Sequence, residues 1–124
     1  MKYLYLIIFI TIVTGVGAVF AQPTLEKNSI CQNGSASARR MEYSESYTIK
    51  RQLMAEIGAT NPRLYQLDHI IPLELGGSND RSNLALEPIA QAHIKDKMEN
   101  YYHELYCQGG IELHKAQQIV VSYY

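Results

Sequence analysis

The strongest constraint on the fold is a stretch in which short apolar runs alternate with proline and glycine. Residues 64–71 are rich in apolar side chains and end at a proline, residues 84–86 also end close to a proline, and two glycines lie between these runs. The pattern predicts two strands joined by a glycine loop. Residues 90–107 have apolar side chains at helical spacing and are followed by two glycines, which predicts a helix.

Further helices are predicted on both sides of this unit. Residues 47–57 carry apolar side chains at every fourth position, with Ser44 or Ser46 as an N-cap and a glycine just past the end. Residues 111–122 form the last predicted helix. The polar stretch 22–46 has little periodicity and predicts an irregular arm.

The same spacing predicts which side chains the last two helices bury. The expected inner faces are Ile94, Met98, Tyr101 and Leu105 in the first, and Leu113, Ala116, Ile119 and Val120 in the second.

The beginning of the chain predicts export. Lys2 precedes an unbroken apolar run over residues 3–13, and Val19, Phe20 and Ala21 form a small-x-small cleavage signal. This pattern is typical of a secretory signal peptide, residues 1–21, removed after Ala21. The alternative is an uncleaved N-terminal anchor, because the apolar run is nearly long enough to cross a bilayer. Either way we expect a secreted or periplasmic protein, with no membrane segment in the mature form.

The mature part has two cysteines, Cys31 and Cys107. An exported compartment permits oxidation, and a small domain gains from a covalent crosslink. We therefore predict a disulfide between them; two free thiols in a reducing compartment are the alternative.

Charge argues mildly against tight nucleic-acid binding. The chain has 11 Lys and Arg against 12 Asp and Glu, and removal of Lys2 leaves 10 against 12. Binding to phosphates would need a local basic surface. The candidates before the central motif are Arg39, Arg40, Lys50 and Arg51, and those around it are Arg81, Lys95 and Lys97.

Four polar residues have a characteristic spacing in the predicted unit of strand, loop, strand and helix. Asp68 and His69 end the first strand, Asn83 follows fourteen residues after the histidine, and His93 ten residues after that. In the contexts Asp-His-Ile-Ile-Pro-Leu-Glu-Leu-Gly-Gly and Ser-Asn-Leu, this arrangement resembles the HNH (His-Me finger) endonuclease family. Sequence features outside this motif also resemble those of a group of small exported HNH-type proteins from bacteria and their phages.

The resemblance implies an α+β fold with a ββα-metal core, about residues 64–107, and flanking helices. This core would lie in a single nuclease-like domain, residues 47–124, with one disulfide. His69 would be the general base that activates water, and Asn83 would orient its imidazole or backbone. Asp68 would bind the metal.

His93 would be the second metal ligand. The family often has another ligand four residues later, and here that residue is Lys97, which cannot ligate while protonated; Asp96 could substitute. One carboxylate and one imidazole favour Mg²⁺ or Mn²⁺ with several waters, with Zn²⁺ or Ni²⁺ as alternatives.

The expected function is therefore metal-dependent hydrolysis of phosphodiester bonds in DNA, with RNA as the alternative substrate, and with low sequence specificity. As the resemblance implies, the products would carry 5′-phosphate and 3′-hydroxyl ends. We expect a monomer, and the sequence does not indicate whether an inhibitor protein exists. The alternatives are a non-catalytic nucleic-acid or protein binding module on the same scaffold, and a structural exported protein.

Overall fold

The computed structural model describes residues 27–124, so the predicted signal peptide lies outside the described part. Its elements are α1 (Lys27–Cys31), α2 (Ser35–Arg39), α3 (Tyr43–Glu56), η1 (Pro62–Leu64), β1 (Tyr65–His69), η2 (Leu73–Leu75), η3 (Arg81–Asn83), β2 (Leu84–Pro88), α4 (Ile89–Cys107) and α5 (Leu113–Val121). Within residues 27–124, no helix is both long and apolar enough to span a bilayer.

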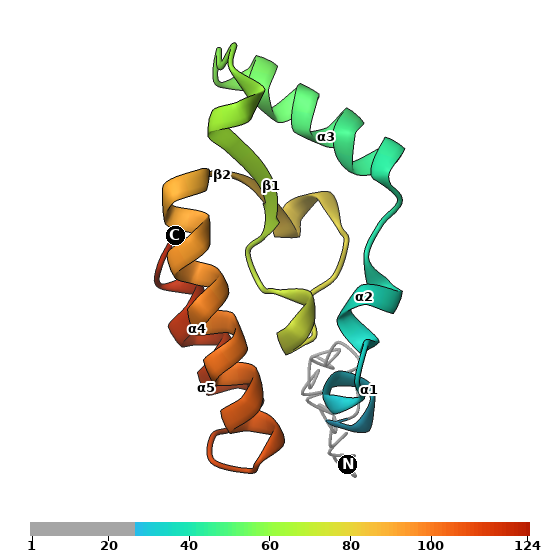
Figure 1. Cartoon of the computed structure of the whole chain (residues 1–124), viewed down its shortest axis with the longest axis vertical. Coiled ribbons are helices and arrows are strands. Elements are labelled where there is room, and N and C mark those ends of the chain that lie inside the picture. The colour runs from blue at the N-terminus through green and yellow to red at the C-terminus, as the bar shows by residue number, and fades with distance from the viewer. Residues whose placement is uncertain (1–26) are drawn as a thin grey trace, which may run out of the picture.

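The fold is α+β, built on one two-stranded antiparallel sheet. In the register of β1 and β2, Asp68 lies opposite Ala85 and His69 opposite Leu84. The helix α4 follows β2 directly and contacts both strands, as α3 does from another direction. In Figure 1 the two strands lie between α3 and the α4–α5 pair. The short helix α1 contacts α4. The predicted order of strand, loop, strand and helix is confirmed.

The glycine loop between the strands is anchored in the helical core. Leu75 is fully buried against Ala116 and Val120 of α5, with Tyr102 of α4 packed beside them. Gly77 must be glycine, because a Cβ there would lie 1.8 Å from the carbonyl oxygen of Ile71. The chain therefore turns back on itself here, and the turn sets the path of the loop that follows His69.

The disulfide between Cys31 and Cys107 is present. It joins the end of α1 to the end of α4, across a separation of 76 residues. The N-terminal segment is thus covalently fixed beside the helix that crosses the sheet. The described part of the chain contains no free cysteine.

The N-terminal part is more regular than expected. Within the segment predicted as an irregular arm lie the short helices α1 and α2. Their spans of five residues are too short for periodicity to reveal. The next helix, α3, begins at Tyr43, so Ser44 and Ser46 lie inside it and neither is its N-cap. Ser46 instead donates its hydroxyl hydrogen to the Tyr43 carbonyl at 2.9 Å.

The inner face of α4 was predicted incorrectly. Ile94 and Tyr101 are 61% and 59% exposed, whereas Lys95 and Glu99 are buried. The expectation assumed that apolar side chains face inward. Here a lysine and a glutamate take the inward positions because they pair with each other and with the sheet. The buried face of α4 is Ala92, Lys95, Glu99 and Tyr106.

Candidate functional site

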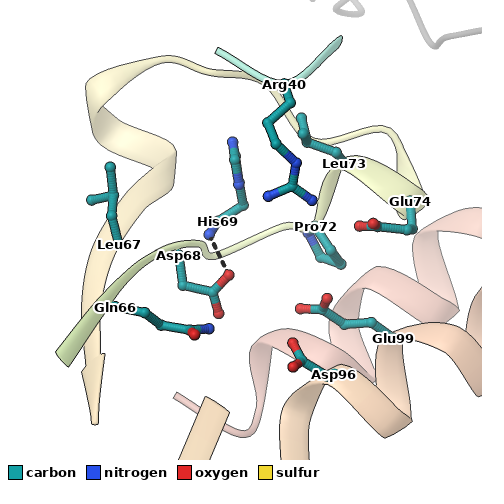
Figure 2. A pocket seen from close by; sticks show the side chains of 10 residues that line it. All are labelled: Arg40, Gln66, Leu67, Asp68, His69, Pro72, Leu73, Glu74, Asp96 and Glu99. Atoms are coloured by element: carbon teal, nitrogen blue, oxygen red, sulfur yellow. Dashed lines mark hydrogen bonds between the residues drawn. The ribbon is translucent and has the colours of Figure 1, made fainter. Parts of the chain in front are cut away.

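The end of β1 borders a polar cavity of about 270 Å³. Its lining comes from the residue after α2, from β1 and the loop that follows it, and from α4: Arg40, Gln66, Leu67, Asp68, His69, Pro72, Leu73, Glu74, Asp96 and Glu99. Figure 2 shows the Arg40 guanidinium entering from one side, with the carboxylates of Glu74, Asp96 and Glu99 on the other. The cavity therefore brings one histidine and one arginine together with several carboxylates.

Asp68 and His69 are consecutive strand residues, so their side chains leave the sheet on opposite faces. Asp68 is directed toward α4, where Lys95 Nζ donates to its Oδ2 at 2.6 Å. His69 borders a second hollow of about 300 Å³, which Arg40 and Tyr43 also line. The backbone N–H of His69 donates to Asp68 Oδ1 at 2.9 Å. Both residues therefore line the first cavity, and of the two only His69 also borders the second hollow.

Asn79 orients the His69 ring. Its Nδ2 donates to the Arg39 carbonyl at 2.7 Å, so the atom that faces His69 Nε2 at 2.8 Å is the amide oxygen Oδ1. An oxygen acceptor there requires Nε2 to carry the hydrogen. In the neutral imidazole the free electron pair is then on Nδ1, which is the arrangement that a proton acceptor needs.

Asn83 does not contact the imidazole ring. Its side chain accepts from the backbone N–H of Ile71 at 2.9 Å and donates to the Ile71 and Ser78 carbonyls at 2.9 and 2.8 Å. Asn83 thus holds together the two ends of the loop that follows His69. Neither predicted role, a hydrogen bond to the imidazole or to the backbone of His69, is seen, because the side chain bonds the backbone of Ile71 and Ser78 instead.

Lys95 is the most buried ionisable side chain near the site, with 2% exposure. Its ammonium donates to Asp68 Oδ2 at 2.6 Å, to the His69 carbonyl at 2.7 Å and to the Tyr124 hydroxyl at 2.7 Å. Glu99 Oε1 lies 3.0 Å away. The three N–H bonds of the ammonium are used by the first three oxygens. Glu99 is therefore attracted by charge, and among the described residues its Oε1 has no hydrogen-bond donor.

The carboxylates around Lys95 differ in their affinity for protons. Burial raises the pKa of Glu87 to about 8, assisted by hydrogen bonding with Asp68 and by the charge of Asp68. Burial also raises the pKa of Glu99 to about 7, against the effect of Lys95. For Asp68, burial acts upward, but hydrogen bonds from Glu87 and Lys95 and the lysine charge lower its pKa overall. At neutral pH the ammonium therefore faces one firmly ionised carboxylate, Asp68.

This charge pattern predicts a pH dependence of stability. The folded protein holds a proton on Glu87 that the unfolded chain releases above the ordinary glutamate pKa of 4.5, so stability should fall as pH rises from about 4.5 to about 8. We expect the Tm to fall by about 5–10 °C between pH 5 and pH 8. The measurement is thermal unfolding followed by circular dichroism.

The matched variants separate this effect from general charge effects. Glu87→Gln, which cannot ionise, should reduce the decline to the part that Glu99 contributes, while the exposed Glu45→Gln should leave it unchanged. If Glu87→Gln and the wild-type protein lose stability in parallel over this range, the assignment to Glu87 is wrong.

The other predicted residues are not brought together. His93 is exposed and does not line the cavity at Asp68. It lies two positions before Lys95, roughly 200° around the helix, so it faces away when Lys95 faces Asp68. Lys95 itself is buried and is therefore not a phosphate contact, contrary to the prediction. Arg81 is exposed and pairs with Glu56 at 3.2 Å, and Lys97 is exposed.

The predicted metal ligands do not fit a bound metal ion in this arrangement. Both Asp68 oxygens already accept hydrogen bonds, from His69 N–H and from Lys95 and Tyr124. His93 is not available at the same place. Asp96, the substitute considered, does line the cavity. Within residues 27–124, only Cys31, His103 and Cys107 form a group of three ligand-type side chains close enough for one ion, and its two cysteines form the disulfide.

No protein-family model, curated protein or solved structure matches this chain. The resemblance to HNH nucleases therefore rests on the sequence motif alone.

Three residues of the site were not predicted from sequence in their actual roles. Asn79 lies in the glycine loop, Glu99 was not considered, and Tyr124 is far from the motif in sequence. A charged pair at helical spacing, Lys95 and Glu99, is the one signal that the sequence offered. An i,i+4 pair of that kind is common on exposed helix faces, so it does not by itself indicate burial.

Proposed function

We propose that this protein is an exported HNH-type endonuclease that hydrolyses phosphodiester bonds of DNA with little sequence preference, RNA being the alternative substrate. The observation that carries the proposal is the His69 imidazole at the cavity, whose Nε2 is paired with Asn79 so that Nδ1 is free to accept a proton. The motif around His69 supports the same reaction class. Export would direct the activity at nucleic acid outside the cytoplasm.

In the proposed reaction, His69 Nδ1 takes a proton from a water molecule, the oxygen of that water bonds to the phosphorus, and the P–O3′ bond on the opposite side breaks. The departing 3′ oxygen takes a proton from solvent. Arg40 lines the same cavity and carries the positive charge suited to the phosphate oxygens. Asn83 keeps the loop after His69 closed, which supports a constant position of the ring. The products would carry 5′-phosphate and 3′-hydroxyl ends.

A basic and aromatic groove along α3 is the best candidate for the nucleic-acid surface. We call it the α3 groove: a hollow of about 540 Å³ that Tyr43, Tyr47, Lys50, Arg51 and Arg63 help to line. It shares Tyr43 and Ser46 with the hollow at Arg40 and His69, so the two are adjacent. None of the described residues lining either hollow is an aspartate or glutamate.

The side chains of this groove suit a nucleic-acid strand. Tyr43 is 80% exposed and its ring stacks on that of Tyr47 at 6.2 Å between centroids. The Arg51 guanidinium lies 6.0 Å from the centre of the Tyr47 ring. Exposed rings provide faces for bases, and the neighbouring cations provide attraction for phosphates. The groove thus replaces Arg81 and Lys95 as the proposed contact surface.

Removing two of these charges is expected to weaken binding. The double variant Arg51→Ala/Arg63→Ala should bind a fluorescent single-stranded oligonucleotide about tenfold more weakly at low salt. The slope of log affinity against log salt should also fall by roughly one to two units. The measurement is fluorescence anisotropy across a salt series. Lys115→Ala, an exposed charge on α5, is the control, and an equal loss in that control would refute the assignment.

The test of the proposed function is nicking of supercoiled plasmid by purified, disulfide-bonded protein. Reactions contain Mg²⁺, Mn²⁺, Zn²⁺ or EDTA, with His69→Ala beside the wild-type protein. Nicking that disappears in the variant supports the proposal. Absence of cleavage under every condition, from protein shown to be folded, would exclude it.

A non-catalytic binding module is the second candidate, because Lys95 neutralises Asp68 and His93 faces away from the cavity. Such a module would bind nucleic acid without cutting it. The anisotropy measurement distinguishes the two: binding that is equal in wild-type and His69→Ala protein, with no nicking in either, would favour the module.

A further inference from the structure

The Lys95 ammonium lies where a bound cation would lie. Four oxygens surround it: Asp68 Oδ2 at 2.6 Å, the His69 carbonyl and the Tyr124 hydroxyl at 2.7 Å, and Glu99 Oε1 at 3.0 Å. Carboxylate and carbonyl oxygens are the ligands that hard divalent cations prefer. The centre of the Tyr124 ring also lies near the ammonium, 4.2 Å from the Lys95 nitrogen.

The tertiary fold forms the oxygen-lined position that the Lys95 ammonium occupies. Lys95 reaches it from the buried face of α4, with 2% of its surface exposed. A buried ammonium is tolerated only where oxygens replace its lost hydration. The oxygens come from three separate parts of the chain, the end of β1, α4 and the residues after α5, so the tertiary fold assembles them.

We propose that Lys95 is the built-in cation of this site and takes the place at Asp68 that a divalent metal ion would otherwise fill. Asp68 then keeps a charge partner without any bound metal. The same ammonium also holds the backbone carbonyl of His69, so it fixes the end of β1 next to the imidazole. The consequence for cleavage, activity that persists in EDTA, rests on the proposed function; the consequence for metal binding does not.

The test measures Mn²⁺ binding by electron paramagnetic resonance of the free ion. Lys95→Ala leaves Asp68 and Glu99 facing the space that the ammonium filled, and we expect it to bind one Mn²⁺ at least tenfold more tightly than the wild-type protein. Adding Asp68→Asn to that variant should abolish the gain. Lys97→Ala removes an exposed lysine from the same helix and should bind Mn²⁺ like the wild-type protein.

Two measurements that leave Lys95 in place keep the proposal falsifiable if Lys95→Ala does not fold. The Tm of the wild-type protein should be the same in Mn²⁺ and in EDTA, and Asp68→Asn should not change Mn²⁺ affinity. A wild-type protein that binds one Mn²⁺ and loses it on Asp68→Asn would overturn the proposal. Folded Lys95→Ala with unchanged Mn²⁺ affinity would overturn it as well. Absence of nicking would count against the proposed function alone, because neither readout depends on cleavage.

Discussion

Replacing Cys31 and Cys107 together with serine is expected to lower the free energy of unfolding by about 3–5 kcal/mol. The disulfide closes a loop across 76 residues, and the unfolded chain loses more conformational freedom when a crosslink closes a longer loop. The folded structure adds a second reason: the bond joins α1 to the end of α4, and Ile30 beside it is fully buried. A domain this small has little other core to compensate.

Urea unfolding at pH 7 measures the loss, with the slope m compared between proteins so that changes in the unfolded state are recognised. The wild-type protein reduced with a phosphine should unfold like the double serine variant. A loss below about 1 kcal/mol would mean that packing of α1 against α4 suffices without the crosslink.

The second large effect concerns activity. If the proposed function holds, His69→Ala should slow plasmid nicking by about 10²–10⁴-fold, the usual contribution of a positioned proton acceptor. Asn79→Leu should cause a smaller loss, because it removes the acceptor that keeps the hydrogen on Nε2 and leaves the ring itself in place. The measurement is the initial rate of conversion from supercoiled to open-circular plasmid under single-turnover conditions.

The control is His114→Ala, which removes an exposed histidine on α5 and should leave the rate within about twofold of wild type. Both histidine variants are checked for an unchanged Tm. If His69→Ala retains the wild-type rate, another group is the proton acceptor, and the motif would have only a structural role here.

Local features of the sequence were enough to predict the order of the main elements. Prolines and glycines commonly end helices and strands, because their backbone constraints act on neighbouring residues only. The strand pair, the loop and the helix that follows were therefore predictable. The pairing of Cys31 with Cys107 was predictable for a different reason: the sequence contains no other cysteine. The short helices α1 and α2 were missed because five residues carry too little periodicity.

The site was predictable only in part. The positions of Asp68 and His69 at the end of β1 follow from the motif, but their partners do not. Asn79 was found to orient the imidazole, while Asn83 holds the loop backbone. Hydrogen-bond partners depend on how the loop folds back, and a short-range pattern does not contain that path.

What the sequence alone determined is the order of the strand pair and the longer helices, the motif and the disulfide. Only the tertiary structure decided which face of α4 is buried. Predicting burial from apolar spacing assumes that hydrophobic side chains face inward. Lys95 and Glu99 are buried instead because oxygens and charges from β1 and from the residues after α5 surround them. That balance depends on groups distant in sequence, since burying a charge is favourable only when its partners are brought to it.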